Sequence, residues 1–355
     1  MTTPSKPVRL GFVGAGGRTV RELLDLVQIP GAEIAALCDI DQARCDDAIQ
    51  RTRSRTEQGG NAEAIERAKA MQPKTYGDVK AMLEGTDLDA VYVSLPPFAH
   101  GAIEHAVLDA KKALFVEKPV AMEMTTAREI MDHVRKAGVI TCVGYQSRYS
   151  TAIAAAKKLL DGVPIGLAIA IRMGGLPGTA WWRVQNRSGG MLVEQHTHGV
   201  DLMRYLVGEV IQVFAFGETQ LLTDVPGLDI YDVNSVAVKF ASGAVGSIAN
   251  TCALQPGQGS PPNVAGSVHI VAKGMTVQAG AGSVTVFKPE RQREEIAGEG
   301  DPNLEMNRVF VEAVRTGDTS QIRSDYEDGL KTFELTYACQ LSAEREQPVT
   351  LGQGY

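Results

Sequence analysis

The sequence predicts a two-domain α/β protein: a parallel sheet covered by helices, then an α+β domain with a large, mostly antiparallel open sheet. Over the first 146 residues, short apolar runs alternate with helix-period segments, and a glycine-rich turn follows the first run. Beyond that point, apolar runs are separated mainly by Gly, Pro and Asp. Parallel strands need helical crossovers and antiparallel strands do not, so this change marks a boundary. We assign residues 1–146 to the first domain and 147–355 to the second.

The first domain is predicted to alternate strands with amphipathic helices. Strands are expected at 8–13, 33–38, 89–95, 113–116 and 139–145. Apolar residues at i, i+3, i+4 and i+7 give three helix faces, at 20–27, 103–110 and 127–134. The third helix has a capping-box pattern, Thr126-x-x-Glu129, and Gly138 just past its end. The polar stretch 51–74 is typical of a surface helix with a loop.

The second domain is predicted to begin with an alanine-rich helix and to continue as an antiparallel sheet. Its expected strands are 166–173, 210–219, 233–240, 244–252 and 268–272. A Pro/Gly-rich loop covers 254–266, and two helices close the chain. The first closing helix is marked by Met306, Val309, Phe310 and Ala313.

Composition excludes several classes of protein. The formal charge is −7, from 35 basic and 42 acidic side chains, so no basic surface points to nucleic acid. No apolar run approaches the ~18 residues of a membrane helix, and the N-terminus lacks a signal-peptide core. The cysteines are odd in number, five, and form no C-x-x-C pair, which favours reduced thiols and a cytoplasmic protein without disulfides or a zinc site.

A glycine-rich turn leads from the first strand into the first helix: Gly14-Ala15-Gly16-Gly17-Arg18-Thr19. Such a turn lets backbone N–H groups and the helix N-terminus meet a pyrophosphate. Thr19 occupies the third glycine position of G-x-G-x-x-G, so helix and strand are expected to lie slightly further apart there. Glycine turns between strands and helices are common, and an ordinary structural turn stays an alternative.

Two further strand ends point to the cofactor. Asp39 ends the second strand 25 residues after Gly14, where a carboxylate can accept hydrogen bonds from ribose hydroxyls and would repel a 2′-phosphate. NAD is therefore favoured over NADP. The alternative is an aspartate that starts the next helix, a position that Asp41 would fill equally well. The cofactor set also includes residues at and after the end of the predicted strand 89–95: Ser94, Leu95, Pro96 and His100. Loop geometry alone would also explain the prolines there.

Glu117-Lys118-Pro119 follows the predicted strand 113–116, and with the glycine turn and Asp39 it resembles the glucose-fructose oxidoreductase and inositol dehydrogenase family, Gfo/Idh/MocA. A second anchor is Gly189-Gly190 followed by Glu194, His198 and Asp201, similar to the family's D-x-x-x-H-x-x-D with Glu for the first Asp. The resemblance covers nearly the whole chain. It implies a Rossmann domain, NAD(P), a sugar or polyol substrate, and a homodimer or homotetramer.

The resemblance also implies a catalytic set. Lys118 would polarise the substrate oxygen or relay its proton, and His198 would take or return that proton. Glu194 and Asp201 would share one helix face with His198. Glu117 belongs to the cofactor-binding set or orients the lysine. Without the resemblance, a strand-end lysine and a packing histidine are the ordinary interpretations.

Besides Glu194 and His198, four residues are candidates for substrate contact: Arg148, Tyr149, Trp182 and Arg183. An indole can cover the apolar face of a sugar while arginine binds a hydroxyl or an anion, although core packing of one Trp explains the pattern equally well. No histidine has metal-ligand spacing, so no metal is predicted. The leading function is NAD-dependent oxidoreduction of a sugar or polyol. A hydride-recycling glycoside hydrolase or lyase and a non-catalytic nucleotide or sugar sensor remain alternatives.

Overall fold

The computed structural model describes residues 6–259, 266–280 and 282–353, and the chain forms two compact units. The first unit comprises the chain up to Gly144 and the later segment Asn303–Asp328. The second comprises Tyr145–Pro302 and the chain from Gly329 onward. The single boundary predicted at 146/147 differs from this division, because the chain returns to the first unit to add helix α11 (Pro302–Thr316).

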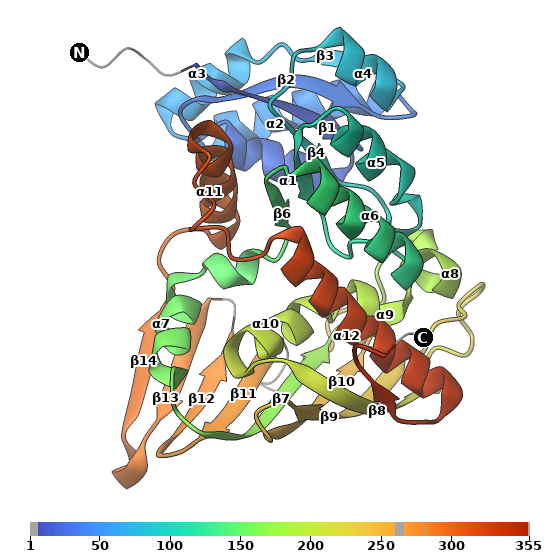
Figure 1. Cartoon of the computed structure of the whole chain (residues 1–355), viewed down its shortest axis with the longest axis vertical. Helices are drawn as coiled ribbons and strands as arrows, with labels where there is room; N and C mark the ends of the chain where they lie inside the picture. The colour runs from blue at the N-terminus through green and yellow to red at the C-terminus, as the bar shows by residue number, and fades with distance from the viewer. Residues whose placement is uncertain (1–5, 260–265, 281, 354–355) are drawn as a thin grey trace. The chain divides into compact units, whose positions relative to one another are not determined.

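The first unit is built on a parallel six-stranded sheet in the order β3-β2-β1-β4-β5-β6 (Figure 1). The strands are β1 (Val8–Val13), β2 (Ala32–Cys38), β3 (Lys74–Tyr76), β4 (Ala90–Val93), β5 (Ala113–Val116) and β6 (Thr141–Val143). All five predicted strands are present. The edge strand β3 escaped prediction because it is three residues long and mostly exposed. The strand order reverses between β1 and β4, the place where open parallel sheets bind ligands.

Helices connect these strands: α1 (Gly17–Leu26), α2 (Ala43–Gly59), α3 (Ala62–Ala70), α4 (Val79–Gly85), the 3₁₀ turn η1 (Pro97–Ala99), α5 (Ala102–Asp109) and α6 (Met124–Ala137). Helix α6 ends as predicted, with Gly138 in the left-handed conformation at φ 65°. The predicted capping box at Thr126 is wrong. The N-cap is the extended Glu123, three residues before Thr126, and Met124 is already buried in the first turn of the helix.

Aromatic rings on the central strands hold α11 in the first unit. Phe12, Tyr92 and Phe115 stack in a row with centroids 4.8 and 4.4 Å apart. Phe310 of α11 meets the rings of Tyr92 and Phe115 edge-on, at 5.5 Å each. The predicted apolar face of this closing helix is confirmed, because Met306, Val309, Phe310 and Ala313 are buried.

The second unit contains a nine-stranded sheet in the order β14-β13-β12-β11-β7-β10-β9-β8-β15. Only β7 and β10 pair in parallel, so the predicted mostly antiparallel sheet is confirmed. The strands are β7 (Ile165–Met173), β8 (Val210–Glu218), β9 (Val233–Phe240), β10 (Val245–Thr251), β11 (Ser267–Ala272), β12 (Met275–Ala279), β13 (Ser283–Phe287), β14 (Arg293–Ala297) and β15 (Val349–Thr350). Prediction missed the last four.

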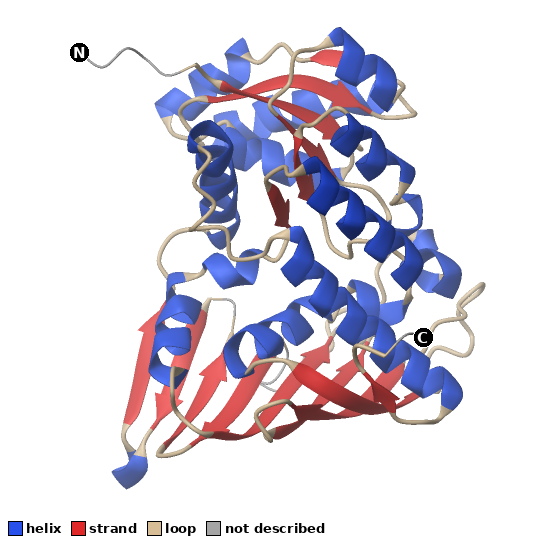
Figure 2. Cartoon of the chain, in the orientation of Figure 1, coloured by secondary structure: helices blue, strands red, loops and turns tan. Residues whose placement is uncertain are grey.

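Helices cover one face of this sheet (Figure 2). They include α7 (Thr151–Leu160), α10 (Thr197–Val207) and α12 (Tyr326–Arg345). The shorter η2 (Gln146–Tyr149) comes before α7, and η3 (Ala180–Arg183), α8 (Gln185–Ser188) and α9 (Gly190–Glu194) come between β7 and α10. The inner face is apolar over most of its width, with Ala168, Ala170, Val236 and Ile248 buried. Of the predicted loop 254–266, residues 260–265 lie outside the described part. Within that part, no helix has the length and apolarity to cross a membrane.

Candidate functional site

The glycine turn is held between three strand ends. Gly14 has φ +89°, and a β-carbon there would lie 2.3 Å from the carbonyl oxygen of Ser94. The Gly14 N–H donates to the carbonyl of Cys38 at 2.8 Å, and the hydroxyl of Thr19 donates back to the Gly14 carbonyl. The first position of the motif therefore accepts only glycine.

The turn leaves room and hydrogen-bonding capacity for a phosphate. Gly16 precedes α1 without any side-chain cap, and β-carbons at Gly16 and Gly17 would meet open space. The hydroxyl of Ser94 is buried and has no hydrogen-bond partner among the described residues. Open backbone N–H groups at a helix N-terminus, with a buried hydroxyl nearby, fit the pyrophosphate and ribose of a dinucleotide.

Asp39 is half-buried at the end of β2 and is tied to the turn. One carboxylate oxygen accepts a hydrogen bond from the Ala15 N–H at 2.8 Å, and the other accepts from the Asp41 N–H at 3.0 Å. Asp41 in turn accepts from the Ala43 N–H at the start of α2. The N-cap position of α2 is Gln42, the side chain that bonds the first helical residue is that of Asp41, and Asp39 lies beside the glycine turn.

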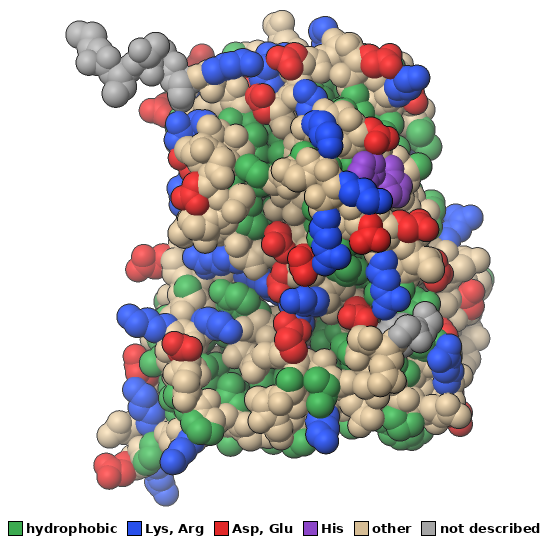
Figure 3. All heavy atoms as spheres, viewed as in Figure 1, with side chains coloured by type: hydrophobic (Ala, Val, Ile, Leu, Met, Phe, Trp, Pro, Cys, Tyr) green, Lys and Arg blue, Asp and Glu red, His purple; other side chains and the backbone are tan. Residues whose placement is uncertain are grey.

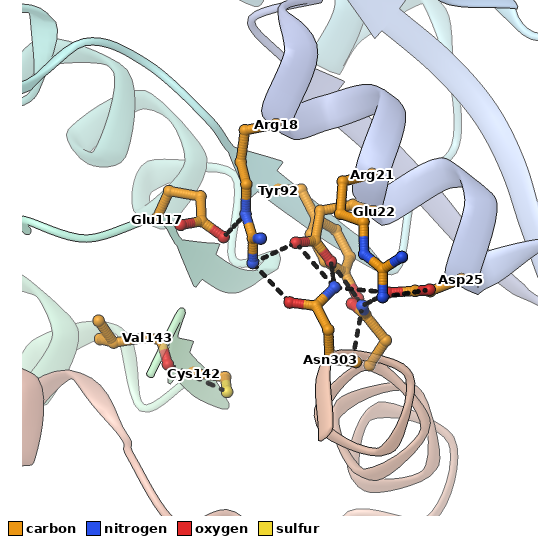
Figure 4. A network of polar contacts seen from close by, with 10 residues as sticks. Arg18, Arg21, Glu22, Asp25, Tyr92, Glu117, Cys142, Val143 and Asn303 are labelled. Carbon is orange, nitrogen blue, oxygen red and sulfur yellow. Dashed lines mark hydrogen bonds and ion pairs between the residues drawn. The ribbon is translucent and has the colours of Figure 1, made fainter. Parts of the chain in front are cut away.

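Glu117, the residue before Lys118, is bound by the first helical turn after the glycine motif. The Arg18 guanidinium donates to the Glu117 carboxylate at 2.7 Å and to Asn303 Oδ1 at 2.7 Å (Figure 4). Gly144 makes room for this pair, because a β-carbon there would lie 2.7 Å from a Glu117 oxygen. Sequence reasoning assigned Arg18 and Glu117 to the cofactor. Their mutual contact favours the alternative in which Glu117 orients the segment that carries Lys118.

This pair belongs to a larger set of buried polar groups, here called the α1–α11 network (Figure 4). Arg18 also forms an ion pair with Glu22 at 2.6 Å. Burial raises the pKa of Glu22 to about 7. The side-chain amide of Asn303 donates to Asp25, and that of Asn307 donates to Glu22. The Tyr92 hydroxyl donates to Asn307. No sequence pattern predicted the contact between α1 and α11, because the hydrogen-bonded residues are up to 285 positions apart in the chain.

His100 lies in the loop after β4, and its imidazole is wholly buried. Nδ1 is 2.6 Å from the Glu104 carboxylate, whose other oxygen accepts from the Gly101 N–H. Nε2 is buried with no hydrogen-bond partner in the described chain. His100 therefore fixes the loop that carries Leu95 and Pro96. Whether it also contacts a cofactor stays a prediction.

The proposed acid/base segment in the second unit is not one continuous helix. Helix α9 ends at Glu194 and α10 begins at Thr197, with Gln195 and His196 between them. Both intervening N–H groups donate to the carbonyl of Met191, which closes the first helix. The predicted helix face is therefore interrupted: Glu194 ends α9, whereas His198 and Asp201 lie three residues apart on α10. Glu194 is 4% exposed and terminates its own helix.

Asp201 is paired with Arg148, a contact that the sequence did not predict. Arg148 binds its carboxylate in a bidentate pair at 2.8 and 2.6 Å, and both residues are buried. Tyr149 is buried as well. This pairing counts against substrate contact by Arg148 and Tyr149, because the guanidinium is already engaged. The His198 ring meets the Tyr145 ring edge-on at 6.1 Å.

Beneath the α9–α10 break lies a polar row on the otherwise apolar inner face of the sheet. Arg172 on β7 pairs in register with Asn250 on β10, and Asn250 pairs with Asn234 on β9. The Arg172 guanidinium donates to Gln195 at 2.5 Å, and the Gln195 amide donates to Glu194 at 2.6 Å. Together with His196, these residues are called the inner-face cluster. The sequence analysis missed this cluster. Its detectable signal was a polar residue at an inward-facing position, where apolar residues are expected, on each of three strands.

Comparisons with known proteins identify the family of this chain. Residues 8–145 match the model described as an oxidoreductase family with an NAD-binding Rossmann fold, GFO_IDH_MocA, and 153–277 match the GFO/IDH/MocA C-terminal domain. The chain belongs to the Gfo/Idh/MocA family. A myo-inositol 2-dehydrogenase from Thermotoga maritima is 26% identical over 97% of this chain and 98% of its own.

Solved structures of the same fold cover nearly the whole chain. Levoglucosan dehydrogenase in complex with NADH and levoglucosan aligns with a TM-score of 0.82 at 19% identity, over 98% of this chain and 100% of its own. The WlbA dehydrogenase of Bordetella pertussis, in complex with NADH and UDP-GlcNAcA, aligns with a TM-score of 0.77 at 21% identity, over 98% and 100%. As a Gfo/Idh/MocA protein, this chain is an oxidoreductase with an NAD-binding domain.

The family motifs fall in different units of this member. Lys118 belongs to the first unit, whereas Glu194 and His198 belong to the second. Trp181, Trp182 and Arg183 lie on η3, half-buried, with the two indole rings 5.0 Å apart. Within the described residues no group of three or more His, Cys, Asp or Glu is placed to hold a metal ion. On the face drawn in Figure 3, acidic and basic side chains are interspersed.

Proposed function

We propose that this protein transfers a hydride between NAD and a secondary hydroxyl or keto carbon of a sugar, polyol or sugar derivative. The observation that carries the proposal is the bond from Arg18, in the first turn of α1, to Glu117, the neighbour of Lys118. It joins the turn that fits a pyrophosphate to the strand end that carries the proposed catalytic lysine. The family match and relatives named for myo-inositol and levoglucosan support the substrate class.

The side chains supply what such a reaction needs. The bound nicotinamide would accept or return the hydride. Lys118 polarises the substrate oxygen with its ammonium group, and His198 removes or returns the hydroxyl proton. Glu194 binds a neighbouring hydroxyl or assists His198. Trp182 and Arg183 are proposed to contact the substrate from η3.

Two substitutions test this assignment. Lys118→Met and His198→Asn should each lower turnover by ~10²-fold or more while NADH affinity stays unchanged, since a lost acid/base group typically costs that much. A sugar and polyol panel is followed by nicotinamide absorbance and product analysis. One NAD reduced per product formed supports net oxidoreduction. Product without net NADH would favour hydride recycling, and nucleotide binding without any product would favour a sensor.

We also propose that NAD is preferred over NADP because Asp39 lies beside the glycine turn with its carboxylate half-buried. A 2′-phosphate near this carboxylate would be repelled. Titration with both nucleotides should show tighter binding of NAD, and Asp39→Ser should narrow the difference. Preference of the unaltered protein for NADP would contradict the assignment.

A homodimer or homotetramer is proposed on the outer face of the second sheet. Leu167, Val245 and Val271 form an exposed apolar row across β7, β10 and β11. Contiguous apolar surface of this kind usually marks an interface. Light scattering that shows only a monomer would count against it. The five cysteines are buried and none forms a disulfide, which supports the proposal of a reducing compartment, the cytoplasm.

A further inference from the structure

Two imidazoles meet between helices α5 and α6 of the first unit, away from the residues assigned to NAD or to catalysis. The Nδ1 atom of His105, on α5, lies 2.9 Å from the Nδ1 atom of His133, on α6. Both residues are half-buried, and Figure 3 shows histidine side chains at the surface over these two helices. Spacing along the chain does not reveal the pair, because the two residues are 28 positions apart and only helix packing brings them together.

Asp109 contacts the other side of the His133 ring. It follows His105 by four residues, so the two side chains share one face of α5. Its Oδ1 atom is 3.3 Å from His133 Nε2. A carboxylate only accepts hydrogen bonds, so the Nε2 atom carries the proton and the Nδ1 atom of the neutral ring keeps its lone pair. That lone pair faces His105. A histidine that donates to a carboxylate on one side and offers a lone pair on the other is typical of metal ligands.

The separation of the two Nδ1 atoms fits a shared metal ion. Zn²⁺ binds a histidine nitrogen at about 2.0–2.1 Å, which places adjacent ligands about 3.0 Å apart in octahedral and about 3.4 Å apart in tetrahedral geometry. The observed 2.9 Å is close to the octahedral value. It is also the length of a hydrogen bond, in which His105 Nδ1 donates to His133 Nδ1. When a metal ion binds, this proton moves to His105 Nε2, and both rings stay neutral.

The ligand atoms identify the class of ion. Imidazole nitrogen suits Zn²⁺, Ni²⁺ and Cu²⁺, whereas Mg²⁺ and Ca²⁺ take oxygen ligands. Within the described chain, no third His, Cys, Asp or Glu joins the pair to form a metal-holding group, so water must fill the remaining positions. The site is open to water, because the His133 side chain is 24% exposed. The Asp109 carboxylate supplies one negative charge behind the ligand.

We propose that His105 and His133 form a binding site for a divalent transition-metal ion, held by both Nδ1 atoms, with Asp109 as a positioning residue. Such an ion joins α5 to α6 and stabilises the folded chain in proportion to the logarithm of its concentration. Helix α5 follows the loop that contains His100, and α6 follows the segment that contains Lys118. The inference does not depend on the proposed hydride transfer.

The test uses untagged, full-length protein freed of metal with a chelator. Calorimetric titrations with Ni²⁺ and Zn²⁺ measure affinity and stoichiometry, and Mg²⁺ is the hard-ion control. His105→Gln and His133→Gln each remove one ligand, and Asp109→Asn removes the positioning carboxylate. Asp132→Asn is the matched control, since it removes an exposed carboxylate beside His133 in the sequence. Electron paramagnetic resonance of the Cu²⁺-loaded protein counts the coupled nitrogens.

The unaltered protein should bind one Ni²⁺ or Zn²⁺ per chain at this site, and its melting temperature should rise with either ion but not with Mg²⁺. Each Gln variant should weaken binding by roughly ten-fold or more, and Asp109→Asn by about ten-fold, as loss of an orienting partner does. The control should bind as the unaltered protein does. If a Gln variant does not fold, the Cu²⁺ spectrum of the unaltered protein decides, and two coupled nitrogens are expected.

Three results overturn the proposal: neither Ni²⁺ nor Zn²⁺ binds, the Cu²⁺ spectrum shows fewer than two coupled nitrogens, or the Gln variants bind as tightly as the unaltered protein. In each case His105 and His133 form a hydrogen-bonded pair only.

Discussion

The α1–α11 network and the inner-face cluster are both buried polar groups around an arginine and a glutamate, one in each unit of the chain, and they differ in completeness. In the first, Arg18 reaches Glu22, Glu117 and Asn303, and each Asn amide meets a carboxylate. In the second, Arg172 Nε and Asn234 Nδ2 are buried without a hydrogen-bond partner among the described residues. The first set is closed by the protein alone, and the second is open.

The pKa directions of the two arginines follow this difference. Burial alone would lower the pKa of Arg18, but Glu117 and Glu22 outweigh it and raise the pKa above its usual value. For Arg172, burial outweighs the attraction of Glu194, and its pKa is lowered. The closed network fixes the segment that carries Lys118, through the bond from Arg18 to Glu117. An open cluster retains unsatisfied groups that a ligand can satisfy, as binding sites do.

The largest expected effect comes from removing each arginine. Arg18→Met should lower the free energy of unfolding by about 3 kcal/mol, because it leaves buried carboxylates without their cation. Arg172→Met should cost only about 1 kcal/mol, because the lost cation was poorly compensated. Chemical denaturation of both variants measures the difference. Arg18→Lys keeps the positive charge but loses the planar guanidinium that donates to several partners. Its free energy of unfolding should lie between those of Arg18→Met and the unaltered protein. Equal costs for the two Met variants would contradict the comparison.

We next expect Glu22 and His196 to make the free energy of unfolding depend on pH in opposite directions. Glu22 has a pKa raised from 4.5 to about 7, so its contribution is fully present below pH 4.5 and is lost as the pH rises through 7. His196 has a pKa lowered from 6.5 to about 3, so stability falls as the pH drops below 6.5. Over 2.5 pH units each effect amounts to at most ~3 kcal/mol, at ~1.4 kcal/mol per unit.

Variants with a non-titrating side chain separate the pH-dependent contribution of Glu22 from that of His196. Glu22→Gln should gain stability relative to the unaltered protein between pH 5 and 8, and His196→Asn should gain between pH 6.5 and 4. Melting temperatures across this range, at constant ionic strength, are the measurement. Parallel pH profiles for the two variants would show that neither group titrates as its surroundings require.

The strands that sequence reasoning found are those whose apolar content exceeds their surroundings, such as β1 and β9. Strand β14 escaped because Arg293, Glu294 and Glu295 are exposed on it, so no apolar alternation announces it. The same limit applies to the helix break at Gln195. The side chains of α9 and α10 suit one helix, and only the backbone bonds to Met191 reveal the interruption.

The candidate site was predictable where its residues are contiguous and hidden where they are distant. The glycine turn and the Lys118 segment each occupy a few consecutive positions, so spacing and residue type identified them. Asn303 meets Arg18 across 285 residues, and no local pattern carries that contact. The partners of Arg148 and Arg172 were likewise set by tertiary packing, which explains why Arg148 was assigned to the substrate and Arg172 was overlooked.

The smallest expected effect distinguishes the two sets through glycines that lie against them. A β-carbon at Gly144 would lie 2.7 Å from the Glu117 carboxylate, which is fixed by Arg18, whereas one at Gly174 would meet Arg172 at an ordinary 3.7 Å. Gly144→Ala should therefore cost about 1 kcal/mol, as overpacking does, and lower turnover by moving the Lys118 segment. Gly174→Ala should change stability by less than about 0.5 kcal/mol. Denaturation midpoints and turnover of the two variants, measured side by side, test this. The comparison would be contradicted if Gly174→Ala lowered stability and Gly144→Ala did not. The α1–α11 network, which holds the Lys118 segment, would then be the one that tolerates an added methyl group.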